Sequence, residues 1–409
     1  VSTISVRRFG IKPNYWVCSS SSQLRLLTVC EFFLQGNDFL DVLILAGNAR
    51  SLIANRGDLI HDMRNAGLEV AAAVPTADYL PEVEALGITI YPIEMGRTGI
   101  NPVHDLKTLW SFYRLIRKVK PKVVFGYTIK PVVYGSLAAK AAGVPRIYSM
   151  ITGLGHVFTT ESAKNRRLQK VVSLLYRVGL ACNRKVFFQN PDDLQEFTER
   201  GILRDKSKAV RTYGSGVDIQ SFNATALPEG GLTFLFIGRL LTEKGVEEFC
   251  EAAAQLHIDH PAVRFIAVGP HDPNLPHSCA LEDLERWKRQ GIVEFIGGVS
   301  DVRPWIAECS VFVLPSYREG TPRSVLEAMS MRRPIITSDA PGCRETVEEG
   351  VNGFLVAPRR SAPLLEAMRK FAEQPALVPQ MAEASRALVE LHYDVRKVNK
   401  VILKAMELV

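Results

Sequence analysis

The chain has 409 residues, of which 47% are hydrophobic and 23% charged, and its formal net charge is +7. This composition is typical of a soluble globular protein, and the length is sufficient for two or three domains with sizeable cores. No apolar run approaches the roughly 18 residues that cross a bilayer. Seven cysteines without C-x-x-C or metal-ligand spacing exclude a zinc site of the usual kind and predict reduced thiols in a cytoplasmic protein.

The charge is unevenly distributed along the chain. Residues 1–212 contain 29 Lys and Arg against 17 Asp and Glu, whereas the remainder contains 21 against 26. A basic first half can bind phosphates, an anionic lipid surface or nucleic acid. Nucleic acid fits least, because the sequence has no zinc finger and no aromatic RNA-binding motif. A solvated basic surface without a specific partner explains the same numbers.

Residues 1–39 come first and form an extension of uncertain structure, whose modest apolar run carries Arg25 and Glu31 and so makes a poor signal peptide. Strand and helix patterns then alternate over residues 40–212, the predicted first domain. Alternation of this kind indicates a parallel sheet with helices on both faces. The predicted strands are 41–46, 69–74, 88–92, 123–127, 146–150 and 185–190, and the predicted helices are 55–65, 104–119, 135–142 and 163–182.

The pattern is interrupted by residues 213–231, which are rich in Ala, Pro and Gly and predict a linker. A second alternating series follows over residues 232–394, and a last helix covers about 395–407. Two similar α/β halves joined by a short linker imply a deep cleft that faces the carboxyl ends of the strands. The strands predicted in the second half are 232–238, 264–269, 293–296, 311–314, 334–338 and 353–356.

Two glutamates near the end of the chain, Glu319 and Glu327, flank a Gly-Thr-Pro helix start. We expect Pro322 at the first helical position, with the free amides of Gly320 and Thr321 forming an anion site at the positive helix end. A nucleotide sugar suits this arrangement, because its diphosphate takes the helix end and its hydroxyls donate to the carboxylates. An isolated pair of this kind is also typical of a plain helix N-terminus with acids that suit the dipole.

A second motif follows the first strand of the second half, where Gly238 precedes Arg239 and Lys244. Glycine permits close approach of a ligand, while the arginine fork and the lysine point charge are the usual ways of holding phosphate. A surface turn with solvated bases is the alternative, and the glutamate segment downstream favours diphosphate binding. Gly297 and Gly298 end a further strand, either as a ligand contact or as a tight turn.

The stretch from Val311 to Pro358 closely resembles the donor-binding half of the family 4 retaining glycosyltransferases. The glutamate pair, the strand at 334–338, the turn at 341–345 and the strand start at Asn352 follow the family's order, and the resemblance extends over residues 41–409. It implies the α/β fold called GT-B, in which two Rossmann-like doubly wound parallel-sheet domains face a cleft. It also implies that the terminal segment 395–409 crosses back to the first domain.

The resemblance carries roles over to individual residues. Arg239 and Lys244 would bind the donor diphosphate, Glu319 the transferred sugar and Glu327 the ribose. The loop of Gly297 and Gly298 would lie beside the base. We therefore predict Glu319, Arg239 and Lys244 as the catalytic residues, and as the donor site the residues Gly238, Arg239, Lys244, Gly297, Gly298, Glu319, Gly320, Thr321, Pro322 and Glu327.

In the first domain the sequence identifies functional residues less clearly than in the second. Several polar residues follow its strands and are candidate acceptor contacts or, equally, capped turns: Gly47, Asn48, Arg50, Arg97, Lys130, Gly153, Gly155 and His156. Many members of the family place a histidine after the fourth strand, where this chain has Ile129 followed by Lys130. His156 is a candidate substitute for that histidine.

The resemblance implies a retaining transferase that moves a hexose or N-acetylhexosamine from a nucleotide-diphosphate sugar, with UDP the expected nucleotide. The first domain resembles transferases that act on polyprenyl-diphosphate-linked glycans in bacterial glycan assembly. No D-x-D pair is present, so we expect bases and a helix end in place of a metal, and no cofactor beyond the nucleotide-sugar substrate.

The basic helix predicted within 104–122 suits an anionic membrane surface, so the expected location is the cytoplasm or the inner face of the membrane. A core-facing stripe with a solvated basic face is the alternative for this helix. Two other functions stay open: a nucleotide-sugar 2-epimerase, which needs acid/base residues that we do not find, and a non-catalytic nucleotide-sugar-binding protein.

Overall fold

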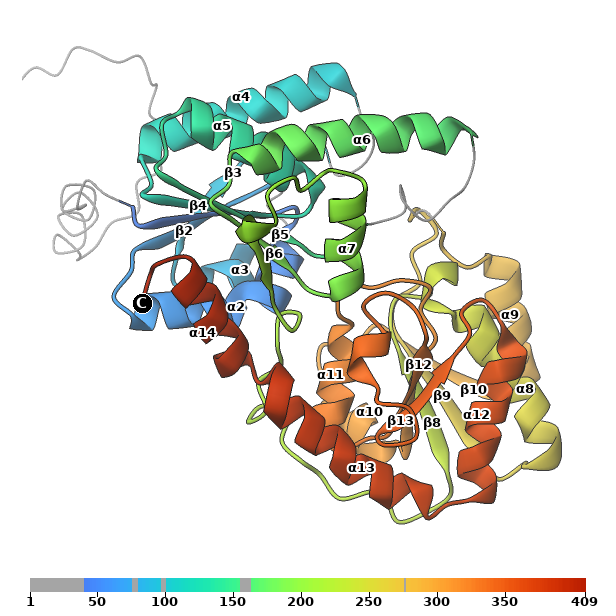
Figure 1. Ribbon diagram of the computed structural model, residues 1–409. Helices are drawn as coiled ribbons and strands as arrows, with labels where there is room; N and C mark the ends of the chain where they lie inside the picture. Colours follow the sequence, from blue (N-terminus) through green and yellow to red (C-terminus); the bar gives the residue numbers. More distant parts are fainter. Residues whose placement is uncertain (1–39, 76–79, 97–100, 155–162, 276) are drawn as a thin grey trace, which may run out of the picture. The chain divides into compact units, whose positions relative to one another are not determined.

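The computed structural model describes residues 40–75, 80–96, 101–154, 163–275 and 277–409 (Figure 1). These residues belong to a single unit built on two parallel sheets, which we call the first and the second domain. Both sheets follow the doubly wound pattern, which confirms the predicted fold class. In the described part of the chain, no helix combines the length and apolar character that crossing a membrane requires.

The first domain has seven strands in the order β3-β2-β1-β4-β5-β6-β7, and every pair is parallel. Its central strands are buried on both faces, which explains their continuous apolar sequences. The strands are β1 (Val42–Leu45), β2 (Val70–Val74), β3 (Thr89–Pro92), β4 (Val123–Tyr127), β5 (Arg146–Ile151), β6 (Lys185–Phe188) and β7 (Ala209–Arg211). Strand β7 was not predicted; it is an edge strand of three residues and carries little periodicity.

Helices cover both faces of the first sheet (Figure 1). Residues of α4 and α5 pack on one face, and residues of α2 and the last helix of the chain pack on the other. The helices are α2 (Ala49–Asn65), α3 (Leu80–Glu84), α4 (Pro102–Val119), η1 (Pro131–Gly135), α5 (Ser136–Ala141), α6 (Ala163–Ala181), α7 (Pro191–Glu199) and η3 (Lys206–Lys208).

Helix α2 begins six residues before the predicted start at Asn55, because Asn48 caps it: the Asn48 side chain accepts a hydrogen bond from the Ser51 amide at 2.7 Å. Arg50 therefore lies in the first turn of the helix, whereas the predicted helix start at residue 55 had placed it before the helix, which was wrong. The cap brings Asn48 and the first turn of α2 directly to the carboxyl end of β1.

The second domain has six parallel strands in the order β10-β9-β8-β11-β12-β13. Its strands are β8 (Thr233–Ile237), β9 (Arg264–Val268), β10 (Val293–Gly297), β11 (Val311–Leu314), β12 (Ile335–Ser338) and β13 (Gly353–Val356). Its helices are η4 (Thr242–Lys244), α8 (Val246–Asp259), α9 (Leu281–Gln290), α10 (Arg303–Glu308), α11 (Arg323–Ser330), η5 (Arg344–Thr346), α12 (Ser361–Glu373), α13 (Leu377–Leu388) and η6 (Val389–Tyr393).

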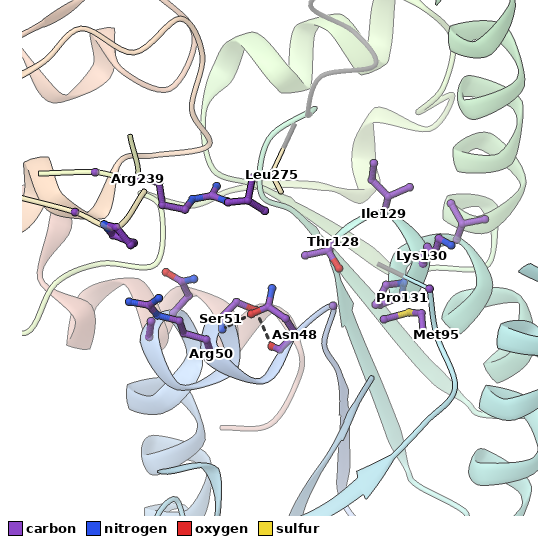
Figure 2. A pocket seen from close by; sticks show the side chains of 18 of the residues that line it. Asn48, Arg50, Ser51, Met95, Thr128, Ile129, Lys130, Pro131, Arg239 and Leu275 are labelled. Carbon is purple, nitrogen blue, oxygen red and sulfur yellow. Dashed lines mark hydrogen bonds between the residues drawn. The ribbon is translucent and has the colours of Figure 1, made fainter. Parts of the chain in front are cut away.

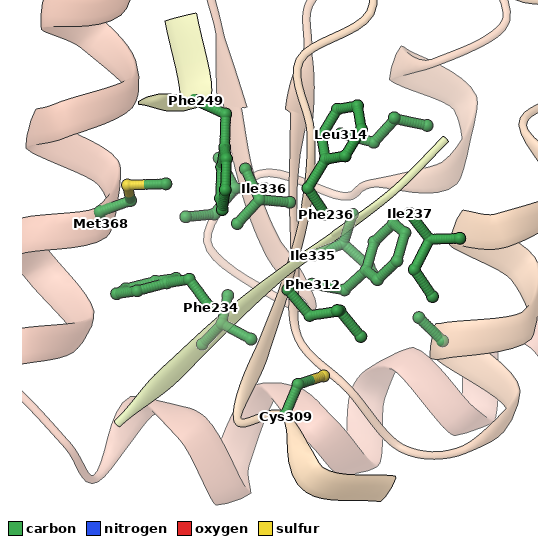
Figure 3. Packing of buried hydrophobic residues seen from close by; sticks show 14 of the residues in the cluster. Phe234, Phe236, Ile237, Phe249, Cys309, Phe312, Leu314, Ile335, Ile336 and Met368 are labelled. Carbon is green, nitrogen blue, oxygen red and sulfur yellow. The ribbon is translucent and has the colours of Figure 1, made fainter. Parts of the chain in front are cut away.

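One contiguous apolar cluster fills the second domain (Figure 3). Phe234 stacks on Phe265 with ring centroids 5.7 Å apart, and Phe249 of α8 closes the cluster from one side. Aromatic pairs of this kind bury large areas and add specific ring contacts. The cluster fixes β8 and β11, whose carboxyl ends carry the two motifs of the sequence.

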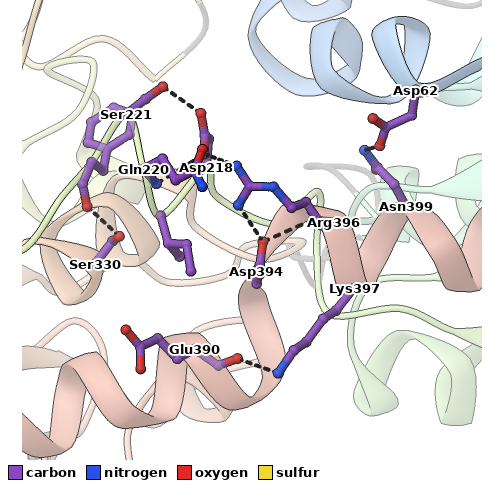
Figure 4. Close-up of polar contacts among 12 residues, drawn as sticks. Asp62, Asp218, Gln220, Ser221, Ser330, Glu390, Asp394, Arg396, Lys397 and Asn399 are labelled. Atoms are coloured by element: carbon purple, nitrogen blue, oxygen red, sulfur yellow. Dashed lines mark hydrogen bonds and ion pairs between the residues drawn. The ribbon is translucent and has the colours of Figure 1, made fainter. Parts of the chain in front are cut away.

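The last helix, α14 (Val395–Ala405), leaves the second domain and packs on the first sheet. Its Asn399 donates to Asp62 of α2 at 2.7 Å (Figure 4). The segment after β7 crosses between the domains at the same place, because the Val217 amide donates to the Tyr393 carbonyl oxygen at 2.8 Å and the Val395 amide donates to the Val217 carbonyl oxygen at 3.0 Å. Two chain crossings therefore run side by side.

Candidate active site

Two adjoining cavities lie where strand order reverses in the two sheets, between β1 and β4 and between β8 and β11. Such switch points are where open α/β sheets bind ligands, because neighbouring loops diverge there. The larger cavity measures about 1040 Å³ and the smaller about 430 Å³. Figure 2 shows side chains of both domains around the larger one. The residues that line both are Ser51, Asn55, Thr128, Ile237, Gly238 and Arg239.

The smaller cavity brings all three predicted catalytic residues together. Lys244 forms an ion pair with Glu319, and both side chains are more than four-fifths buried. Arg239 lines the same cavity with an exposed side chain that has no hydrogen bond or ion pair within the described chain. One of the two predicted phosphate ligands is thus held by a carboxylate, and the other faces the cavity alone.

The backbone around Glu319 is tightly packed. A Cβ on Gly342, which has φ +78°, would lie 2.2 Å from the Glu319 carbonyl oxygen, and a Cβ on Gly320 would lie 2.5 Å from the Thr152 carbonyl oxygen. Both positions therefore require glycine. The Glu319 amide donates to Pro341 at 2.9 Å, so the turn at 341–345 supports the glutamate loop from behind.

Helix α11 begins at Arg323, and Pro322 is its N-cap with φ −72° and ψ 111°. The prediction of Pro322 at the first helical position was wrong by one residue, because its extended ψ places it outside the helix. No hydrogen bond of the Gly320 and Thr321 amides is found with the rest of the described chain. Ser324 ties the helix start to β8 through a 3.1 Å bond to the Ile237 carbonyl oxygen.

Glu327 lies behind this helix start and does not line either cavity. It is buried, and Arg323 donates to it at 2.8 Å. Burial raises the pKa of Glu327, and the Arg323 guanidinium partly opposes that shift. Arg323 itself lines the smaller cavity, so the ion pair connects Glu327 to the site.

The first domain braces the glutamate loop through residues at the start of α7. Asn190 donates to the Gly320 carbonyl oxygen at 2.8 Å, and Thr321 donates to the Gln189 carbonyl oxygen at 3.1 Å. Arg318 forms ion pairs with Asp193 at 2.5 Å and Glu196 at 2.8 Å. Asp193 is fully buried, so this contact is shielded from solvent. The position of Glu319 thus depends on both domains.

The remaining predicted donor residues, Gly297 and Gly298, line neither cavity. The Gly297 carbonyl oxygen accepts a bond from Gly269 at 2.8 Å, and Gly298 lies against Pro270. Gly269 and Pro270 do line the larger cavity. The glycine pair therefore contacts residues of the cavity wall without lining the cavity itself.

Of the predicted acceptor residues, Gly47, Asn48, Arg50 and Lys130 line the larger cavity. Lys130 forms a buried ion pair with Asp105 at 2.9 Å. Gly153 lines neither cavity; a Cβ on it would lie 3.4 Å from the Gly320 amide nitrogen, so this residue contacts the glutamate loop instead. Arg97, Gly155 and His156 lie outside the described residues.

Several residues of the site carry no sequence motif. Thr128 lines both cavities and has φ +69°, a left-handed conformation that strains a β-branched residue. Tyr127, Arg56, Gln189 and Ser215 line the smaller cavity from a strand end, a helix interior, a loop and the domain crossing. Only the unusual pair of glycines around Ser215 marks any of these positions in the sequence.

The lining of the smaller cavity is positively charged. Among its described residues, Arg56, Arg239, Lys244 and Arg323 are basic, whereas Glu319 is the single acid. Burial raises the pKa of Tyr127 to about 12, so its phenol stays neutral. Within the described chain, no cluster of His, Cys, Asp and Glu has the arrangement of a metal site. The cavity is suited to an anion with attached hydroxyl groups.

Both halves of the chain match families of known proteins. The family described as "Glycosyl transferase 4-like" matches residues 42–190, and "Glycosyl transferases group 1" matches residues 231–374. A Campylobacter jejuni relative, N,N'-diacetylbacillosaminyl-diphospho-undecaprenol alpha-1,3-N-acetylgalactosaminyltransferase, is 27% identical over 83% of this chain and 91% of its own. An Escherichia coli relative, UDP-Gal:alpha-D-GlcNAc-diphosphoundecaprenol alpha-1,3-galactosyltransferase, is 26% identical over 80% and 85%.

Solved structures share the fold. Sucrose-phosphate synthase from Thermosynechococcus elongatus matches with a TM-score of 0.76 and 18% identity, over 90% of this chain and 98% of its own. HepE of Anabaena in complex with UDP-glucose matches with a TM-score of 0.72 and 19% identity, over 90% and 100%. These structures support the two-domain fold alone, whereas the family matches show that residues 42–190 are similar to a glycosyl transferase 4-like domain and residues 231–374 to a glycosyl transferases group 1 domain.

Proposed function

We propose that this glycosyltransferase moves a hexose or N-acetylhexosamine from a UDP-sugar to a polyprenyl-diphosphate-linked glycan, with retention of the anomeric configuration. The observation that carries the proposal is the smaller cavity, where Lys244 and Glu319 pair beside Arg239. The two relatives named above are transferases whose names specify undecaprenol-diphosphate acceptors, which supports the choice of acceptor.

In this proposal the donor diphosphate lies against Arg239, Lys244 and the free amides of Gly320 and Thr321. As the bond between the sugar anomeric carbon and the diphosphate oxygen breaks, negative charge develops on the diphosphate, and preorganised donors stabilise it. The acceptor hydroxyl attacks from the same face, and its proton passes to the departing phosphate oxygen. Glu319 orients the sugar through its hydroxyl groups.

The larger cavity is the proposed acceptor site. Its polar wall comes from Asn48, Arg50 and Lys130, and its apolar wall includes Leu168, Val172 and Leu175 of α6. A polar wall can bind glycan hydroxyls and phosphate, while an apolar wall can bind the first part of a lipid. These residues belong to the first domain, and residues of the second domain, among them Arg239 and Pro270, complete the lining of the cavity.

A transfer assay tests the proposal. Purified protein is incubated with radiolabelled UDP-N-acetylgalactosamine or UDP-galactose, with and without a polyprenyl-diphosphate-linked sugar. We expect label in the lipid fraction only when acceptor is present, and loss of that label with Glu319→Ala. Proton NMR of the product reports the anomeric configuration. Conversion of the donor without acceptor would instead indicate an epimerase, and binding without turnover a binding protein.

The first domain also carries a surface suited to an anionic membrane. Three large apolar side chains of α4 are exposed, with Val103 at 65%, Leu106 at 66% and Trp110 at 58%. Lys107, Arg114, Arg117 and Lys118 lie on the same helix. Its core-facing residues are a separate set, Asp105, Thr108, Phe112 and Ile116. An exposed apolar row beside bases is the pattern of an interfacial helix.

Helix α6 repeats this pattern on the same side of the first sheet, near α4 and α5 (Figure 1). Its Val171, Leu174 and Val178 are exposed, while Leu168, Val172 and Leu175 face the larger cavity. One helix thus joins the proposed membrane surface to the proposed acceptor site. A lipid-linked acceptor requires such a connection.

Vesicle flotation tests the membrane surface. We expect the protein to float with vesicles that contain phosphatidylglycerol and to stay in solution with neutral phosphatidylcholine vesicles. The double variant Leu106→Asp/Trp110→Asp should lose flotation. Ile258→Asp is the matched control, because Ile258 is 79% exposed on α8 of the second domain. Equal flotation of the double variant and the wild type would contradict this part of the proposal.

A further inference from the structure

The smaller cavity contains a buried arginine from the first domain that the donor motifs do not include. Arg56 lies in the interior of α2 and is 2% exposed, yet its side chain lines the cavity that holds Arg239, Lys244 and Glu319. It lies well away from both helix ends, so helix-end effects do not explain it. Fully buried arginines are rare unless they are paired.

All the partners of Arg56 within the described chain are neutral. One terminal nitrogen donates to the Asn55 carbonyl oxygen at 2.6 Å and to Ser215 Oγ at 2.8 Å. The other donates to Met150 Sδ at 2.7 Å, and the guanidinium lies 5.0 Å from the centre of the Tyr127 ring. Its Nε is buried and has no partner. No described carboxylate forms an ion pair with it.

The charge of Arg56 therefore remains uncompensated. Burial, opposed by Tyr127 and assisted by the nearby Arg323 charge, lowers the pKa of its guanidinium to about 10, so at neutral pH the group keeps its proton. A buried charge without an opposite charge carries a large desolvation cost. A cost of this size at a cavity wall is explained when an anion occupies the cavity.

We propose that Arg56 is a phosphate ligand supplied by the first domain, which binds the same class of anion as Arg239 from the opposite domain. The inference deepens the proposed function and rests on it for the identity of the substrates. A phosphate in this cavity can belong to the nucleotide donor or to the lipid-diphosphate acceptor. In either case the ligand connects the two domains through charges on both.

Ser215 supplies a second contact on the same wall. Its Oγ accepts hydrogen bonds from Arg56 and, at 3.3 Å, from Gln189 Nε2, so its own proton is free to be donated to a ligand in the cavity. Ser215 lies in the crossing between the domains, between Gly214 and Gly216 with φ +65° and +70°. A Cβ on Gly214 would lie 2.8 Å from Thr321 Cβ, so this crossing lies against the glutamate loop.

Calorimetric titration of UDP and of uridine into the full chain tests the proposal. Arg56→Met and Arg56→Gln should weaken UDP binding by about 10- to 100-fold, the range for a lost hydrogen bond to a charged group, and leave uridine binding unchanged. The matched control is Arg64→Gln on the same helix, where Arg64 is exposed and, among the described residues, donates only to the Leu86 carbonyl oxygen at 2.9 Å.

The acceptor arm distinguishes the two sources of phosphate. Unchanged UDP affinity together with a raised KM for the polyprenyl-diphosphate-linked acceptor assigns Arg56 to the acceptor. Unchanged values in both arms, or parallel losses for UDP and uridine, overturn the proposal. Because UDP binding requires no sugar transfer, its outcome is separate from that of the transfer assay.

Thermal unfolding without ligand separates ligand binding from a structural role. A phosphate ligand predicts that Arg56→Met leaves the Tm unchanged or raises it, since the variant removes an unpaired buried charge. A side chain that mainly holds Ser215 in place predicts a lower Tm with normal UDP affinity, which would overturn the inference. Should Arg56→Met fail to fold, Arg56→Gln keeps a hydrogen-bonding group near Ser215 and decides the question.

Discussion

At the scale of single residues, Arg239 and Lys244 differ although they line the same cavity. Arg239 is exposed and has no partner in the described chain, so its charge is available to a ligand at once. Lys244 is paired with Glu319. A ligand that draws Lys244 toward its phosphate also frees the Glu319 carboxylate for a hydroxyl. The ion pair therefore holds both groups at the wall of the cavity.

This difference predicts that substitutions of the two residues have different effects on the stability of the protein. Arg239→Ala should lower kcat/KM about 10²- to 10³-fold, the size of a lost transition-state donor, and leave the Tm unchanged. Lys244→Ala should lower activity to a similar extent but also reduce the free energy of unfolding by about 1–3 kcal/mol, because it leaves the Glu319 carboxylate buried and unpaired. Steady-state kinetics and denaturant unfolding measure the two effects. An equal loss of stability in both variants would contradict this account.

At the scale of elements, the loops after β1 and β4 support each other. A Cβ added to Gly47 would lie 2.3 Å from Thr128 Oγ1, so Gly47 must stay a glycine while Thr128 keeps its conformation. Thr128 has φ +69° and follows β4, and its carbonyl oxygen accepts a bond from the Val132 amide at 3.0 Å. The strained residue thus lies where the two cavities meet, which is where backbone strain tends to be retained.

A double-mutant cycle tests this contact. Gly47→Ala should destabilise the protein by about 1–3 kcal/mol through overpacking. Thr128→Gly should remove the clash and relieve the left-handed strain, so that Gly47→Ala costs little in that background. Urea unfolding of the four proteins measures the coupling. Additive effects would show that the two loops do not constrain each other.

At the scale of the whole molecule, the domains meet through charged groups close to the glutamate loop. Arg344 of η5 forms an ion pair with Asp192 of α7 at 2.8 Å, and Glu345 lies beside Asp192. Burial, followed by the neighbouring Asp192 carboxyl, raises the pKa of Glu345 from 4.5 to about 7. This contact between the domains therefore titrates near neutral pH.

The sign of the pH effect follows from linkage. The folded protein holds the Glu345 proton more tightly than the unfolded chain, so the stability it contributes is complete below 4.5 and is lost as the pH rises through about 7. Glu345→Gln should flatten the fall in Tm over this interval. Glu373→Gln on α12 is a matched control, because its carboxyl lies on the exposed surface. Thermal unfolding across the interval decides, and an unchanged slope for Glu345→Gln would contradict the prediction.

The strand pattern, the two α/β halves and the donor motifs could be predicted from the amino-acid sequence alone. Strands buried on both faces need continuous apolar runs, and such runs are visible without a structure. That Arg239, Lys244 and Glu319 lie at one cavity was also predictable, because each follows a strand within a short motif. The start of α2 at Ala49 was missed, since it depends on a side-chain cap by Asn48 and not on periodicity.

How residues of the two halves come together around one cavity is visible only in the folded protein. Arg56 is an ordinary position in the middle of a helix until folding buries it beside Ser215, which is 159 residues away. Thr128 shows its strain only in its backbone angle, and the pairing of Lys244 with Glu319 requires β8 and β11 to be neighbours. Charge compensation and close packing are relations between distant residues, and for that reason a local pattern does not contain them.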